Sequence, residues 1–72
     1  MGKSIALSAR QLECLRLASL GHTSSEIASS LGISIRTVDQ YFGEACSRLK
    51  VRNRTHAVAK AVAMGLIEAP AP

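Results

Sequence analysis

The chain has 72 residues, of which 47% are hydrophobic, and nine Lys and Arg residues against five Asp and Glu give it a net charge of +4. This length allows one small domain, and the hydrophobic content excludes a disordered chain. With no Trp, one Tyr and one Phe, the core must consist of Leu, Ile, Val and Ala. That composition favours short packed helices over a β-sandwich, so we predict an all-α fold.

The cysteines and the N-terminus both argue against export. Cys14 and Cys46 are too few for the disulfide framework of a small secreted domain, so we expect buried thiols in a reducing, cytoplasmic compartment. The first residues lack the apolar region of a secretory signal. The longest apolar run, residues 57–67, is interrupted by Lys60 and is too short to span a bilayer, so we expect no membrane partner.

The first expected helix begins after Ser8 and runs to about Leu20. The Ser8 hydroxyl can accept a hydrogen bond from the first turn, and Gly21 supplies a C-terminal stop. Glu13 is spaced to form an ion pair with an Arg along the helix surface. The expected inner face consists of Leu12 and Leu15, with Cys14 and Ala18 as further candidates.

The second expected helix, Ser24–Leu31, begins with a capping box and ends at a glycine. Thr23 stands at the N-cap with Glu26 three residues later, and Gly32 follows the last turn. Only two residues separate this helix from the next N-cap, Ser34. A connection this short prevents an antiparallel pair, so the helices must cross steeply, as in a helix-turn-helix.

The third expected helix, residues 34–49, has two contrasting faces. Spacings of four, three and four place an apolar stripe on one face. The stripe consists of Val38, Phe42, Ala45 and Leu49. The opposite face has no bulky aliphatic residue and consists of Arg36, Gln40, Gly43 and Ser47. Such a helix can anchor in a core through one face and lie in a groove through the other.

The fourth expected helix, Arg54–Met64, is capped by Asn53 and closed by Gly65. Small apolar residues surround it almost completely, which predicts contact with a partner helix, most simply a second copy across a two-fold axis. The expected interface residues are Ala57, Val58, Ala61, Val62 and Met64. The alternative is that Ala is simply a good helix former that is tolerated in water.

Basic residues are concentrated in the second half of the chain. They are Arg36, Arg48, Lys50, Arg52, Arg54 and Lys60. A basic excess around one helix is typical of a protein that binds a polyanion. On composition alone, a solvated surface kept soluble by charge explains it equally well.

Many spaced residues resemble the LuxR-type (GerE- or NarL-type) helix-turn-helix domain, a four-helix fold without a wing. They are Leu7-Ser8, Glu13, Gly21, Thr23, Glu26-Ile27-Ala28, Leu31-Gly32-Ile33-Ser34, Thr37-Val38, Leu49, Val51, Asn53-Arg54, Ala57-Val58 and Gly65-Leu66-Ile67. Segments 11–16 and 53–58 are most similar to the DNA-binding end of quorum-sensing regulators. We therefore expect this domain at residues 7–67, a flexible leader or linker at residues 1–6 and a flexible tail at residues 68–72.

The resemblance implies sequence-specific binding of double-stranded DNA by a bacterial transcription regulator. The third helix would read the major groove, and the fourth would form a homodimer on an inverted-repeat operator. By resemblance, base contacts fall to Asp39, Gln40 and Gly43, and phosphate contacts to Thr37, Tyr41, Arg48, Arg52 and Arg54. The donor face adds Arg36 to the base contacts, and the helix N-terminus adds Thr23, Ser24 and Ser25 to the phosphate contacts.

The residues on the expected reading face leave several interpretations open. Asp39 and Gly43 stand where Lys or Arg is common in the family. Asp39 can accept from a cytosine amine, and Gln40 can bind adenine through two hydrogen bonds. Gly43 either lets the backbone come close or leaves the site weakly specific. Tyr41 either bonds a phosphate or covers the rim of the core.

No residue pattern predicts an enzyme, a cofactor or a metal site. His22 and His56 lack Cys or carboxylate companions at ligand spacing, and so short a chain has little room for a small-molecule pocket. The alternative to DNA binding is a helical interaction module whose fourth helix binds a partner protein, with the basic charge incidental.

Overall fold

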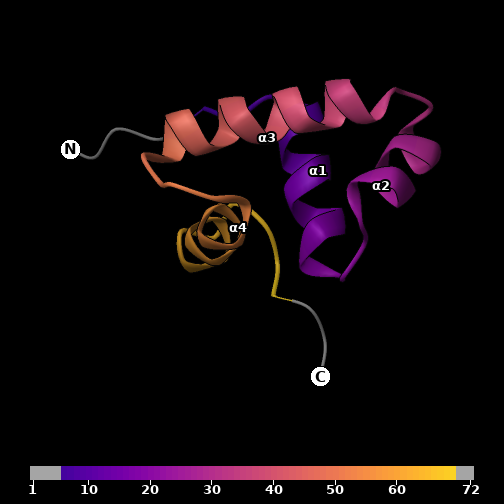
Figure 1. Cartoon of the computed structure of the whole chain (residues 1–72). Helices are drawn as coiled ribbons and strands as arrows, with labels where there is room; N and C mark the ends of the chain where they lie inside the picture. Colours follow the sequence, from indigo (N-terminus) through magenta and orange to yellow (C-terminus); the bar gives the residue numbers. More distant parts are fainter. Residues whose placement is uncertain (1–5, 70–72) are drawn as a thin grey trace.

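The computed structural model describes residues 6–69, which form helices and connecting turns without a β-strand in that range. The helices are α1 (Ala9–Ser19), α2 (Ser24–Leu31), α3 (Ile35–Leu49) and α4 (Arg54–Ala63). The long helix α3 packs against each of the other three, which lie on the same side of it (Figure 1). The predicted all-α helix-turn-helix fold is confirmed, whereas residues 1–5 and 70–72, parts of the expected leader and tail, lie outside the described residues.

Side-chain caps explain where each helix begins. A polar side chain accepts a hydrogen bond from a backbone N–H in the first turn of every described helix. The caps are Ser8, Thr23, Ser34 and Asn53, all four as predicted. The capping box of Thr23 and Glu26 is present, and Ser8 forms a second one with Gln11 that the sequence analysis missed.

Residues in the left-handed backbone conformation end helices α2 and α3. Gly32 adopts φ 68° after α2, as expected for a glycine that stops a helix. Lys50 adopts φ 58° after α3 and is the described non-glycine residue with a positive φ. The backbone N–H of Val51 then bonds the Cys46 carbonyl at 3.0 Å, which folds the chain back so that Val51 packs on the core.

The apolar stripe of α3 forms the centre of the core. Val38, Phe42, Ala45 and Leu49 are all buried, as the spacing predicted. The other helices and the C-terminal segment complete the core with Cys14, Leu15, Ile27, Ala28, Ala57, Ala61 and Ile67. In α1, Leu15 and Cys14 are fully buried and Leu12 and Ala18 are partly buried against the core, so all four expected residues face inward. Burial raises the pKa of the Cys14 thiol, which therefore stays protonated at neutral pH.

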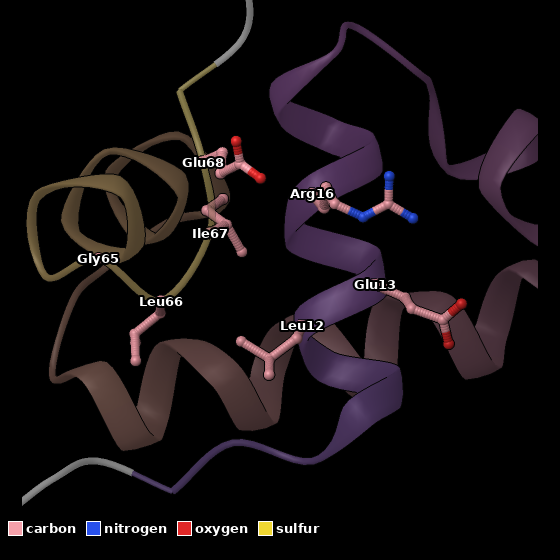
Figure 2. Close-up of a pocket in the computed structure, with 7 residues that line it drawn as sticks. All are labelled: Leu12, Glu13, Arg16, Gly65, Leu66, Ile67 and Glu68. Atoms are coloured by element: carbon pink, nitrogen blue, oxygen red, sulfur yellow. The ribbon is translucent and has the colours of Figure 1, made fainter.

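The C-terminal segment returns to α1 and leaves a shallow pocket beside it. The pocket has a volume of about 250 Å³ and is lined by Leu12, Glu13, Arg16 and residues 65–68. Figure 2 shows the side chain of Ile67 turned toward α1, while the charged ends of Glu13 and Arg16 point away from the pocket. Because no polar groups converge there, the geometry supplies no reactive site.

Candidate nucleic-acid interface

The outer face of α3 is exposed along its whole length. Arg36, Gln40, Gly43 and Ser47 are all exposed, opposite the buried stripe. A Cβ built on Gly43 would meet no atom within 4 Å, so this glycine leaves an open gap in the middle of the face. The helix is thus anchored by its apolar side and presents its donors outward, as predicted.

Asp39 joins three helices through one carboxylate oxygen. Its Oδ1 accepts from the Ser24 hydroxyl of α2 at 3.2 Å and from Arg54 Nη2 of α4 at 3.1 Å. The Arg54 guanidinium also lies 3.8 Å from the centre of the Phe42 ring, an arrangement suited to a cation–π contact. We call Ser24, Asp39 and Arg54 the Asp39 cluster. It brings together one expected base contact and two expected phosphate contacts.

Glu44 forms a second carboxylate contact on the same helix. Its Oε1 accepts from Gln11 Nε2 at 3.1 Å, and its Oε2 lies 3.5 Å from Gln40 Nε2. Gln11 is the buried polar residue of the described chain, at 8% exposure. The amide of Gln40, expected to read bases, is therefore oriented toward its own helix.

The N-terminus of α2 presents hydroxyl groups beside the start of α3. The Thr23 hydroxyl accepts from the Glu26 backbone N–H at 3.1 Å. Hydrogen bonds from the backbone and hydroxyl of Thr23 lower the pKa of the Glu26 carboxyl, which keeps it ionised. Ser25 is exposed and Ser24 is half-buried.

The remaining expected phosphate contacts lie on or beside α3. Arg48 and Arg52 are exposed, and Arg48 Nη1 also donates to the Ala6 carbonyl at 3.2 Å. The Thr37 hydroxyl lies 2.9 Å from that of Ser34. Tyr41 is half-buried, and its side chain packs on the core.

Comparison with known proteins identifies this arrangement. A model of the luxR family of bacterial regulatory proteins matches residues 5–61. The chain belongs to the LuxR family. Its four helices form the helix-turn-helix fold, and the relatives from Brucella ovis and Aeromonas hydrophila are named as transcriptional regulators, not as enzymes.

One relative is the quorum sensing-dependent transcriptional regulator VjbR of Brucella ovis, which is 44% identical over 64 residues, covering 89% of this chain and 25% of VjbR. This LuxR-family chain thus spans about a quarter of the length of the curated relatives it matches. The GerE structure shares the fold, with a TM-score of 0.84 at 24% identity over 92% of this chain and 97% of GerE. The Vibrio cholerae VqmA dimer, a LuxR-type receptor, has a TM-score of 0.83 at 29% identity over 89% of this chain and 30% of VqmA.

The structure divides the residues expected at the LuxR-family dimer interface. Ala57 and Ala61 are fully buried in the core of their own domain, so they offer no surface to a partner and that part of the expectation is corrected. Their small side chains instead let α4 pack closely against α1 and α3. Val58 and Val62 are half-buried, and Met64 is 41% exposed.

Other kinds of site find no support in the described part of the chain. Across residues 6–69, no three His, Cys, Asp or Glu side chains are grouped so that they could hold a metal ion. Both cysteines are unpaired, and Cys46 is half-buried rather than buried as expected. None of the described helices combines the length and apolar character needed to cross a membrane.

The sequence analysis did not predict that Glu44 would accept hydrogen bonds from the amides of Gln11 and Gln40. The signals were local in both cases: Gln40 and Glu44 are four residues apart on one helix, and Ser8 with Gln11 fits a capping box. The Asp39 cluster had no such signal, because its members are fifteen residues apart in sequence.

Proposed function

We propose that this LuxR-family domain docks α3 in the major groove of double-stranded DNA and reads a specific sequence there. The observation that carries the proposal is the division of α3 into a buried apolar stripe and an exposed donor face. An α-helix fits the major groove, where each base pair offers a distinct set of donors and acceptors. A transcription regulator works where the chromosome lies, so we also propose a cytoplasmic location.

The base contacts are assigned to the exposed side chains of α3. Arg36 can bind the two acceptors of guanine, and Gln40 can bind adenine once its amide leaves Glu44. Gly43 lies between them and the C-terminal half of the helix, where its open gap allows close approach. Asp39 is exposed on the same helix.

The phosphate contacts are assigned to both flanks of α3. On one flank, the N-terminus of α2 offers Thr23, Ser24 and Ser25, and helix N-termini favour anions. On the other flank are the guanidinium groups of Arg48, Arg52 and Arg54, whose forked donors suit phosphate oxygens. Thr37 and Tyr41 complete the assigned phosphate contacts.

We also propose that two copies pair through α4 on an inverted repeat. Val58, Val62 and Met64 supply the apolar surface for this contact. The dimeric state described for the similar VqmA supports the proposal. Two recognition helices in such a dimer would meet half-sites about one helical turn apart.

A fluorescence-anisotropy titration tests DNA binding directly. A pool of random duplexes is titrated with the domain at several salt concentrations, and bound duplexes are then amplified to select the preferred operator. If each protomer neutralises about three phosphates, log K for a dimer should fall with log salt at a slope of about −5. Undetectable or salt-insensitive binding at low ionic strength would favour the alternative, an interaction module whose α4 binds a partner protein.

A further inference from the structure

We propose that Asp39 sets the selectivity of this domain by making binding to arbitrary DNA unfavourable, rather than by reading a base. The inference rests on the proposed DNA-binding function. Asp39 keeps Ser24 and Arg54 bonded to the protein itself, so DNA must exchange these contacts for its own. An operator that supplies good base contacts elsewhere on α3 compensates for this exchange, and a random sequence does not.

The geometry of the Asp39 cluster supports an exchange rather than a bystander role. Ser24 and Arg54 approach one and the same oxygen, Oδ1, from opposite neighbouring helices. The stacking of Arg54 on Phe42 holds the guanidinium beside α3 instead of extending it into solvent. Two donors that would otherwise be available to phosphates are thus directed to a carboxylate.

The charge of Asp39 acts in the same direction as its hydrogen bonds. An ionised carboxylate only accepts hydrogen bonds, so it cannot bind a phosphate oxygen. With 58% of its side chain exposed, Asp39 lies on the helix that is proposed to meet DNA, whose phosphates carry the same sign of charge, and like charges at short range repel each other. The carboxylate therefore weakens attraction to any duplex, whatever its sequence.

A purely structural role does not explain the pair. Arg54 and Asp39 are 36% and 58% exposed, and ion pairs with this degree of exposure contribute little to folding stability. The fold is held by the apolar stripe of α3, which does not depend on Asp39. Removing the Asp39 carboxylate is therefore expected to change DNA affinity more than the free energy of unfolding.

Glu44 repeats the arrangement on the next turn of α3. It accepts from Gln40 Nε2 at 3.5 Å, which engages one of the two N–H donors of the amide that is proposed to read adenine. Both carboxylates of α3 thus engage donors that are assigned to DNA. The contact of Glu44 is longer than those of Asp39, so its effect on binding is expected to be smaller.

The test compares Asp39→Asn with Glu68→Gln. Each substitution removes one negative charge from a chain of net charge +4, but Glu68 is an exposed residue of the C-terminal segment beside α1 (Figure 2) and lies outside α3. Affinity is measured for the selected operator and for a random duplex over a range of salt. Asp39→Asn should bind the random duplex about threefold to tenfold more tightly per protomer, and Glu68→Gln should change this affinity far less.

The salt dependence of binding, the ratio of operator to random affinity and thermal unfolding show whether Asp39 acts by holding Arg54 and Ser24 away from phosphates. On the random duplex, the salt slope of Asp39→Asn should become steeper by about 0.9 per protomer, because Arg54 can then neutralise a phosphate there. The ratio of operator affinity to random affinity should fall. Thermal unfolding of Asp39→Asn should stay within about 2 °C of the parent chain, as expected for an exposed pair, and Glu44→Gln should show the same pattern to a smaller extent.

Three outcomes would overturn the inference. Loss of operator affinity in Asp39→Asn, with a changed preference at one base pair, would make Asp39 a base reader. Equal gains in Asp39→Asn and Glu68→Gln would reduce the effect to net charge. If the parent chain binds DNA and Asp39→Asn binds the random duplex no more tightly, the inference alone fails. If the parent chain binds no duplex at any salt, the proposed function fails as well.

Discussion

The two faces of α3 differ in burial, although they belong to one helix: one is packed in the core and the other is exposed. The inner face consists of four buried side chains packed against three other helices. The outer side of the helix is exposed, and there Asp39 and Gln40 form hydrogen bonds of 3.1 to 3.5 Å with neighbouring side chains. Changes to the inner face should therefore alter folding, and changes to the outer face should alter binding.

The largest expected effect comes from removing a buried side chain of the inner face. Leu49 is fully buried, so Leu49→Ala should cost about 2–5 kcal/mol of folding free energy. A small domain has little more stability than that, so the variant should be largely unfolded at 37 °C. Circular dichroism during heating measures the loss.

Leu20→Ala is the matched control for this prediction. Leu20 is 53% exposed, and the same truncation there should change folding free energy by less than about 0.5 kcal/mol. Equal losses at both positions would contradict the assignment of the core to the inner face of α3.

The next effect is expected on the outer face. Gln40→Ala removes the amide assigned to adenine and should weaken binding to the selected operator by about 1–3 kcal/mol. Because Gln40 is exposed, thermal unfolding should change little. Anisotropy on the operator and on a random duplex measures the difference, and an equal loss on both duplexes would mean that Gln40 reads no base.

The outer edge of α4 differs from both faces of α3, because its side chains are apolar and yet partly exposed. Val62→Glu places a charge in the proposed apolar contact and should weaken dimers about tenfold or more, since an unpaired charge is costly to bury. Sedimentation velocity over a range of concentrations measures the monomer–dimer balance. Ala59→Glu on a more exposed position of the same helix tests whether the effect belongs to Val62, and an unchanged balance in Val62→Glu would exclude it from the interface.

The two faces of α3 also differ in how far sequence predicts them. The inner face follows from spacing alone, because a helix brings residues three and four apart to one side, and all four predicted stripe residues are buried. The caps follow from single polar residues before each helix. On the outer face, the sequence predicts which side chains are exposed but not what they contact. The Asp39 cluster depends on how α2 and α4 cross α3, and so does the burial of Ala57 and Ala61, which no local pattern encodes.

At Gly43, a single substitution is expected to raise the stability of the fold and to weaken operator binding. Its backbone is helical and a Cβ would meet nothing within 4 Å. Ala is favoured over Gly inside a helix by about 1 kcal/mol, so Gly43→Ala should raise the melting temperature by about 4–8 °C. Nothing in the folded domain therefore requires a glycine here.

The same Gly43→Ala variant decides between the two interpretations of this position. If the gap lets the α3 backbone approach the bases, the added methyl group should weaken operator binding several-fold while the melting temperature rises. If the gap is only tolerated, binding should stay unchanged or improve with stability. Ser47→Ala provides the comparison, since it also ends in a methyl group on the exposed face one turn further along α3. It should raise the melting temperature less than Gly43→Ala does, because Ser lies between Gly and Ala in helix propensity, and it adds no atom that could obstruct DNA. Opposite signs for stability and affinity in Gly43→Ala alone would establish that the outer face is shaped for a partner and not for the fold.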